Sequence, residues 1–163
     1  MIYILKISRL TWCFLITGCV FSTPFKGAGF DDDSGQILIP HDERVVVAIT
    51  NAIVDRSTRG TFDSKTREIV RSIDDYEGYI AGSFRFEILG DEVWTLSVWR
   101  DREALEKFVN SRQHLDAMYS GSSAVKLMRS VVVDMPAAAL PIDWDTGEKL
   151  LEAETLKPLP LND

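Results

Sequence analysis

One histidine, His114, falls in the central part of the sequence between residues 45 and 135. Its neutral imidazole is suited to act as a general base, and it is also a candidate axial ligand for haem iron, because a histidine titrates near neutral pH. The alternative is a histidine on a helix surface or at an interface that makes only a hydrogen bond. Both interpretations stay open from the residue type alone.

Two other polar residues interrupt apolar strand patterns. Asn51 alternates with Val47 and Ile49, and an amide on an apolar face needs a hydrogen-bond partner. Arg129 lies in a valine-rich run, so on a buried face its guanidinium needs a carboxylate from the same chain or from a second copy. An anionic ligand is the functional alternative for Arg129.

Aromatic residues are candidates for the wall of a pocket that takes an apolar or aromatic molecule. Trp94 and Trp99 fall on opposite faces of one predicted strand, so only one of them can face a given cavity. Aromatic residues in an alternating strand are usually core residues, and that alternative stays open here. The ligand pocket that we predict is lined by Trp99, Phe108, Arg129, Phe84 and Phe86.

Several kinds of chemistry lack their motif. The sequence has no glycine-rich phosphate loop, no nucleophile elbow around a serine, no paired histidines for a metal and no dinucleotide fingerprint. A net charge of -7 without a basic run argues against nucleic acid as a partner. We therefore predict no metal and no cofactor. Oxygen chemistry without a cofactor remains compatible, because a substrate anion made by a base can itself donate the electron; His114 would be that base.

The elements that would position these residues follow from the apolar pattern. A β-branched run begins at Val45, and Asp101 is placed to cap a helix that bends near Asn110. The predicted helices span about 62–73 and 102–120, and the predicted strands span 45–55, 79–88, 93–99 and 125–135. This βαββαβ order predicts an α+β fold of the ferredoxin-like kind with a four-stranded antiparallel sheet over residues 45–135.

Residues 1–19 are typical of a signal peptide. Lys6 and Arg9 precede a short apolar stretch, which is far below the roughly 20 residues that a spanning helix needs. The stretch ends in residues 16–19, Ile-Thr-Gly-Cys, which resembles the lipobox of bacterial lipoproteins with Cys19 as the lipidated residue. An ordinary cleaved signal peptide is the alternative. We therefore expect an exported protein, either anchored to a bacterial membrane or periplasmic.

The two flanking segments show no clear period. Residues 20–44 are rich in loop formers and contain an acidic triplet that lacks the spacing of a calcium loop, so we predict a flexible tether. Residues 136–163 hold four prolines and an amphipathic piece near 146–156. We predict an arm that lies over the domain or over a partner subunit.

The stretch from Ser97 to Met118 carries a family resemblance. It reads SVWRDREALEKF and continues to HLDAM, with Trp99 at a strand end, Phe108 nine residues on and His114 fifteen on. It resembles the antibiotic biosynthesis monooxygenase-like proteins, and most closely an uncharacterised bacterial branch of that superfamily. The resemblance covers about residues 45–135.

What this resemblance implies is a homodimeric α+β barrel, in which two four-stranded sheets pack face to face and each subunit holds a pocket between sheet and helices. Relatives include cofactor-independent monooxygenases, haem-degrading enzymes, isomerases and lyases. Asn51 falls about where the haem-degrading relatives place a catalytic Asn. However, their Trp and later His correspond here to Phe108 and Met118, so a haem role is disfavoured. The favoured interpretation of Asn51 is then a hydrogen-bonded core residue or a pocket-lining one.

Two functions therefore remain. The first is an exported monooxygenase-like protein that acts on or binds a small apolar or aromatic molecule, with His114 and Asn51 as the candidate catalytic residues. The second is a non-catalytic ligand-binding or scaffold lipoprotein with the same fold. Fold alone does not choose between them.

Overall fold

A computed structural model describes residues 20–155 of the chain. The predicted signal peptide with Cys19 and the last eight residues of the predicted arm lie outside the described residues. No helix in the described part is long and apolar enough to cross a membrane.

Four long strands build the sheet, and their order confirms the predicted ferredoxin-like fold. All neighbouring strands are antiparallel, and a short fifth strand extends the sheet, in the order β1-β5-β6-β4-β7. The long strands alternate buried and exposed positions or are buried on both faces, as their β-branched runs predict. They are β4 (Arg44–Val54), β5 (Tyr79–Glu87), β6 (Glu92–Trp99) and β7 (Val125–Pro136), and the fifth is β1 (Val20–Ser22).

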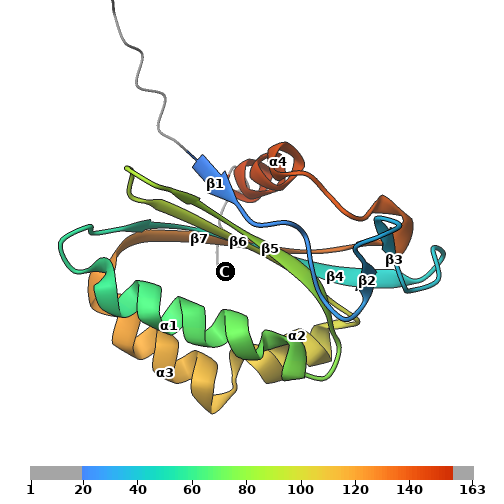
Figure 1. The fold of residues 1–163 in the computed structure, drawn as a ribbon, viewed down its shortest axis with the longest axis horizontal. Helices are drawn as coiled ribbons and strands as arrows, with labels where there is room; N and C mark the ends of the chain where they lie inside the picture. Colours follow the sequence, from blue (N-terminus) through green and yellow to red (C-terminus); the bar gives the residue numbers. More distant parts are fainter. Residues whose placement is uncertain (1–19, 156–163) are drawn as a thin grey trace, which may run out of the picture.

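Three helices cover one face of the sheet and a fourth lies on the other (Figure 1). The first three are α1 (Arg59–Ser72), α2 (Arg102–Val109) and α3 (Arg112–Gly121), and the fourth is α4 (Trp144–Thr155). Asp101 caps α2 as predicted, since its side chain accepts a hydrogen bond of 2.8 Å from the backbone N–H of Ala104. Short 3₁₀ turns span Ile73–Asp75, Ser122–Ala124 and Ala137–Ala139.

Two helix boundaries differ from the prediction. The bend expected near Asn110 is a full break, because Ser111 caps a new helix by accepting a bond from the His114 backbone N–H. Helix α1 begins at Arg59, three residues before the predicted start. Asp63 lies inside this helix and pairs with Arg59 one turn earlier.

The predicted tether over residues 20–44 is wrong, because this segment packs along the sheet. Backbone bonds tie Thr23 to Phe84 and Lys26 to Gly82 at 2.8–2.9 Å, so β5 has a partner along its outer edge. The segment then forms a small hairpin of β2 (Phe30–Asp31) and β3 (Gln36–Ile37). Loop-forming residues hid this, since the contacts are made mainly by backbone and by a few widely spaced apolar side chains.

Glycine is required where the segment approaches β5. A Cβ atom on Gly27 would lie 2.4 Å from the carbonyl oxygen of Ile80 and 2.5 Å from the Cα of Ala81. Both are backbone atoms that cannot turn aside. Gly27 is therefore a close-packing residue of the edge rather than a flexible link.

The two faces of the sheet have separate cores. On the helix-covered side, Trp99, Leu105 and Phe108 form the centre of one cluster. On the opposite side, Ile49 and Leu96 pack beneath Leu151 of α4 and beside Phe30 and Ile37 of the N-terminal segment. The chain thus covers with its own residues the face on which the resemblance implies a second sheet. Sheet-to-sheet pairing of two copies would require α4 to leave this position.

Candidate functional site

An apolar groove lies between α1 and the end of β5, on the helix-covered face. Its volume is about 400 Å³. Phe84 and Phe86 alternate on β5 toward the helices, as the period-2 pattern requires, and Val93 adds to this wall from β6. Two of the predicted pocket residues, Phe84 and Phe86, therefore line the same groove.

The opposite wall of the groove comes from α1. Phe62, Thr66 and Val70 follow one another at a spacing of four residues, which puts them on one helix face. Every side chain of α1 is at least partly exposed, and Val70 is 37% exposed. The helix therefore stands over β5 without filling the space between them.

The rim of the groove is positively charged, although the whole chain carries a net charge of -7. Arg59, Arg67 and Arg71 line it from α1. Arg59 holds Asp63 through two bonds of 2.9 and 3.2 Å and also donates to the Gly90 carbonyl at 3.3 Å, so it fixes α1 to the β5–β6 hairpin. Its charge is therefore balanced inside the groove.

The other two arginines keep their charge available. Arg67 donates to the backbone carbonyl of Asp63 at 3.1 Å, and neither Arg67 nor Arg71 forms an ion pair within the described residues. An apolar cavity with two uncompensated guanidinium groups at its mouth suits a molecule with an apolar body and an anionic group. Their spacing of i and i+4 on the predicted helix was the sequence signal that could have identified them.

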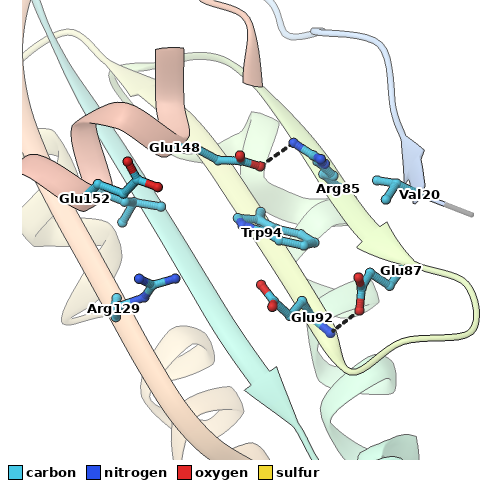
Figure 2. A pocket seen from close by; sticks show the side chains of 9 residues that line it. Val20, Arg85, Glu87, Glu92, Trp94, Arg129, Glu148 and Glu152 are labelled. Carbon is cyan, nitrogen blue, oxygen red and sulfur yellow. Dashed lines mark hydrogen bonds and ion pairs between the residues drawn. The ribbon is translucent and has the colours of Figure 1, made fainter. Parts of the chain in front are cut away.

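A second, polar cavity of about 320 Å³ lies on the opposite face beneath α4 (Figure 2). Arg85 reaches across its top to Glu148 of α4 at 2.5 Å, and its guanidinium stands 4.9 Å from the ring centre of Trp94. Arg129 points into the same cavity, as do Glu92 and Glu152. Four of the residues that line this cavity are glutamates: Glu87, Glu92, Glu148 and Glu152.

Asn51 and Arg129 are brought together at the floor of the polar cavity. Asn51 is only 1% exposed; it donates to a Glu92 carboxylate oxygen at 3.1 Å and accepts from Arg129 at 2.8 Å. Arg129 thus pairs with an amide rather than the expected carboxylate, and its buried Nε–H has no partner in the described residues. Asn51 is a satisfied core amide, which is one of the two alternatives open from the sequence.

His114 lines neither cavity. Its Nδ1 lies 2.9 Å from the carbonyl oxygen of Val109, and its ring is 4.8 Å from that of Phe108. Half-burial lowers the pKa of this imidazole, and the hydrogen bond to Val109 opposes that effect. The imidazole thus links the end of α2 to the start of α3, and this geometry supports a structural role for His114.

Trp99 and Phe108, which were expected in the pocket, pack against each other in the core instead. Trp99 is fully buried, its indole N–H donates to Ser97 at 3.0 Å, and its ring stacks on Phe108 with 4.9 Å between centres. Tyr79 and Tyr76 close the cluster with edge contacts at 5.2 and 5.0 Å. These two residues line neither the groove nor the second cavity, because α2 folds directly onto the end of β6 and both rings are buried there.

The described residues hold no cluster of histidine, cysteine or carboxylate side chains that could bind a metal ion. The chemistry available is therefore that of the arginine-rimmed groove and of the polar cavity beneath α4.

Comparison with protein-family models gives no match, and no curated protein matches the sequence significantly. Solved structures do match. A proposed monooxygenase from Fusobacterium nucleatum aligns with a TM-score of 0.52 and 12% identity over 56% of this chain and 43% of its own. A protein from Pseudomonas aeruginosa gives 0.51 and 14% over 58% and 96%. An antibiotic biosynthesis monooxygenase gives 0.50 and 15% over 59% and 99%.

These matches confirm the predicted fold, which is that of the antibiotic biosynthesis monooxygenase-like proteins. This chain spans about half the length of some of them, including 51% of a proposed monooxygenase from Lactobacillus acidophilus. At 15% identity or less the likeness concerns the fold, and the reaction must be argued from this chain's own residues.

Proposed function

We propose that this protein binds a small apolar or aromatic molecule with an anionic group in the groove between α1 and β5. The observation that carries the proposal is the pairing of the Phe84 and Phe86 wall with the uncompensated Arg67 and Arg71 at its mouth. The apolar wall would take the ring by excluding water, and the guanidinium groups would hold a carboxylate or phenolate.

A binding titration with 2-naphthoate tests this proposal. Thr66→Trp adds a bulky ring inside the groove, so we expect it to weaken binding at least about tenfold, a change of about 1.4 kcal/mol. Tyr119→Trp is the matched control, because Tyr119 is 85% exposed on α3. Equal affinity in the wild type and in the Thr66→Trp variant would place the ligand elsewhere.

A second candidate function is cofactor-independent oxygen chemistry on such a ligand. It is favoured by the fold, since neighbours of this fold include proposed monooxygenases. Guanidinium groups beside a phenol stabilise its anion, which is the form that can donate an electron to oxygen. In this arrangement the positive charges of Arg67 and Arg71 would lower the pKa of the bound phenol, and its proton would pass to solvent water at the open mouth of the groove, since the imidazole of His114 does not line it.

Oxygen uptake with a naphthalene quinol separates the binding and catalytic versions. The catalytic version predicts uptake above the spontaneous rate, lost in Thr66→Trp and retained in His114→Ala. Loss in a folded His114→Ala variant would return His114 to the role of base. No uptake above the spontaneous rate leaves the non-catalytic ligand-binding lipoprotein as the function. Haem is tested by reconstitution, where the absence of a Soret band would end a haem role.

Export, a lipid on Cys19 and a homodimer are further parts of this proposal. Export and lipidation rest on the signal-peptide pattern and on residues 16–19. Labelling with palmitate, lost in Cys19→Ala, tests the anchor. Sedimentation velocity of the purified protein tests the dimer, which must be formed without direct sheet-to-sheet contact unless α4 moves.

A further inference from the structure

Four large apolar side chains are exposed together at one end of the sheet. Val20 and Phe21 of β1 are 42% and 48% exposed, and Ile88 and Leu89 of the β5–β6 turn are 52% and 60% exposed. Val20 lies opposite Glu87 in the strand register, so the turn that follows Glu87 comes next to the first residue of β1 (Figure 1). We call these four residues the end patch.

The charges around the end patch are largely balanced. Asp91 lies within 3.8–3.9 Å of Arg56 and Lys126, and the Glu87 carboxylate accepts the backbone N–H groups of Asp91 and Glu92. The turn therefore presents apolar side chains without a strong field of either sign. Such a surface is suited to enter the boundary between headgroups and acyl chains, rather than to attract an anionic surface by charge.

The chain itself indicates what this surface meets. Cys19 is bonded directly to Val20, and Val20 already pairs with β5. A lipid on Cys19 would therefore enter the bilayer beside the end patch, with no length of free chain between them. An acidic protein on a long tether would stand away from the membrane, but this segment is part of the sheet.

We propose that the end patch is a membrane-contact surface that inserts into the interface of a phospholipid bilayer. This inference rests on the proposed lipid anchor, because the anchor is what would bring the protein to the membrane. Phe21 also packs against Phe86, with 5.3 Å between ring centres, and Phe86 lines the groove. The end patch is thus continuous with the groove wall, so an apolar ligand dissolved in the bilayer meets the groove from the membrane side.

The test uses the full chain purified from membranes and placed in phosphatidylcholine nanodiscs that carry a gadolinium-chelate lipid. Amide NMR signals of residues 21, 88 and 89 should be broadened strongly, and that of Gly35, in the β2–β3 turn, should not. Ile88→Asp with Leu89→Asp should remove most of the broadening. Leu38→Asp is the control, because Leu38 is also a largely exposed aliphatic side chain, at 64%, but follows β3.

Equal broadening of residues 35 and 88 would overturn the proposal, since it describes a protein that tumbles freely on its anchor. The proposal would also be overturned if the protein formed a concentration-dependent dimer and the Ile88→Asp, Leu89→Asp variant did not. The end patch would then contact a second copy of the chain. Mass spectrometry of Cys19 reports the anchor separately. If Cys19 carries no lipid, the anchor proposal fails. The membrane-contact surface is then tested on the unacylated chain in excess nanodiscs, where the absence of broadening at residues 21, 88 and 89 would overturn it.

Discussion

The two ends of the layer between sheet and helices contain similar residues but differ in packing. At one end Trp99, Phe108 and Tyr76 pack ring against ring in a buried cluster. At the other end Phe84 and Phe86 leave a groove of about 400 Å³. Both ends are rich in aromatic residues, so aromatic content does not separate a core from a pocket. The difference lies in the helix above: α2 buries three side chains, and α1 has no fully buried one.

The largest expected difference between the two ends is in stability. Trp99→Ala should lower the free energy of unfolding by about 3–5 kcal/mol, because a fully buried ring leaves a cavity. Phe84→Ala should cost less than about 2 kcal/mol, since the ring already borders open space. Urea unfolding of the two variants measures both values. Equal costs would contradict the contrast between a packed and an open end.

The edge segment supports the open end, because Thr23 pairs with the groove strand at Phe84. Gly27→Ala should lower the free energy of unfolding by about 1–3 kcal/mol, since a Cβ atom would overlap the backbone of β5. Gly35→Ala is not a suitable control because its backbone is left-handed, whereas Gly60→Ala meets no atom within 4 Å. A Gly27→Ala variant as stable as Gly60→Ala would show that the segment is loosely held.

The next largest expected effect is on ligand affinity at the open end, where the groove lies. Arg71→Gln with Arg67→Gln should weaken 2-naphthoate binding about tenfold, because charged hydrogen bonds at a partly exposed rim contribute on the order of 1–2 kcal/mol. Binding of neutral 2-naphthalenemethanol should change little. Arg112→Gln on α3 is the control. An equal loss for the acid and the alcohol would mean that the arginines shape the groove rather than recognise charge.

The smallest expected effect concerns His114 at the packed end. Burial lowers the pKa of His114 below its ordinary value of 6.5, so below about pH 6.5 the unfolded chain binds a proton more readily than the folded one. Stability from this residue is therefore present above pH 6.5 and is lost as the pH falls. Melting temperatures at pH 7.5 and 5.5 should differ more for the wild type than for His114→Gln. If the melting temperature changed by the same amount between these two pH values in both proteins, the imidazole would be exposed to solvent.

Much of the fold could be predicted from the sequence, because alternation in the strands and the Asp101 cap are local signals. The groove was predicted only in part. Phe84 and Phe86 alternate toward the helices, but whether an aromatic side chain meets a helix or a space depends on how far that helix stands from the sheet. Trp99 and Phe108 have the same residue types and fill the core.

Residues 20–44 could not be predicted for a different reason. Their contacts with β5 are made largely by backbone groups 51–61 residues away in the sequence, and no side-chain period records such pairing. For Asn51 and Arg129 the apolar strand pattern indicated only that each needs a polar partner. Which partner each would find depended on the register of β4 with β7, where the two residues lie directly opposite.

The strand that closes the β5 edge has a consequence for self-assembly. An uncovered edge with unpaired N–H and C=O groups is a template for strand addition and aggregation. Here the residues that cover it, from Thr23 to Gly29, are made first but can pair only after β5 has followed. Truncation of the first thirty residues would therefore leave the N–H and C=O groups along this edge of β5 open to strand addition by a second chain.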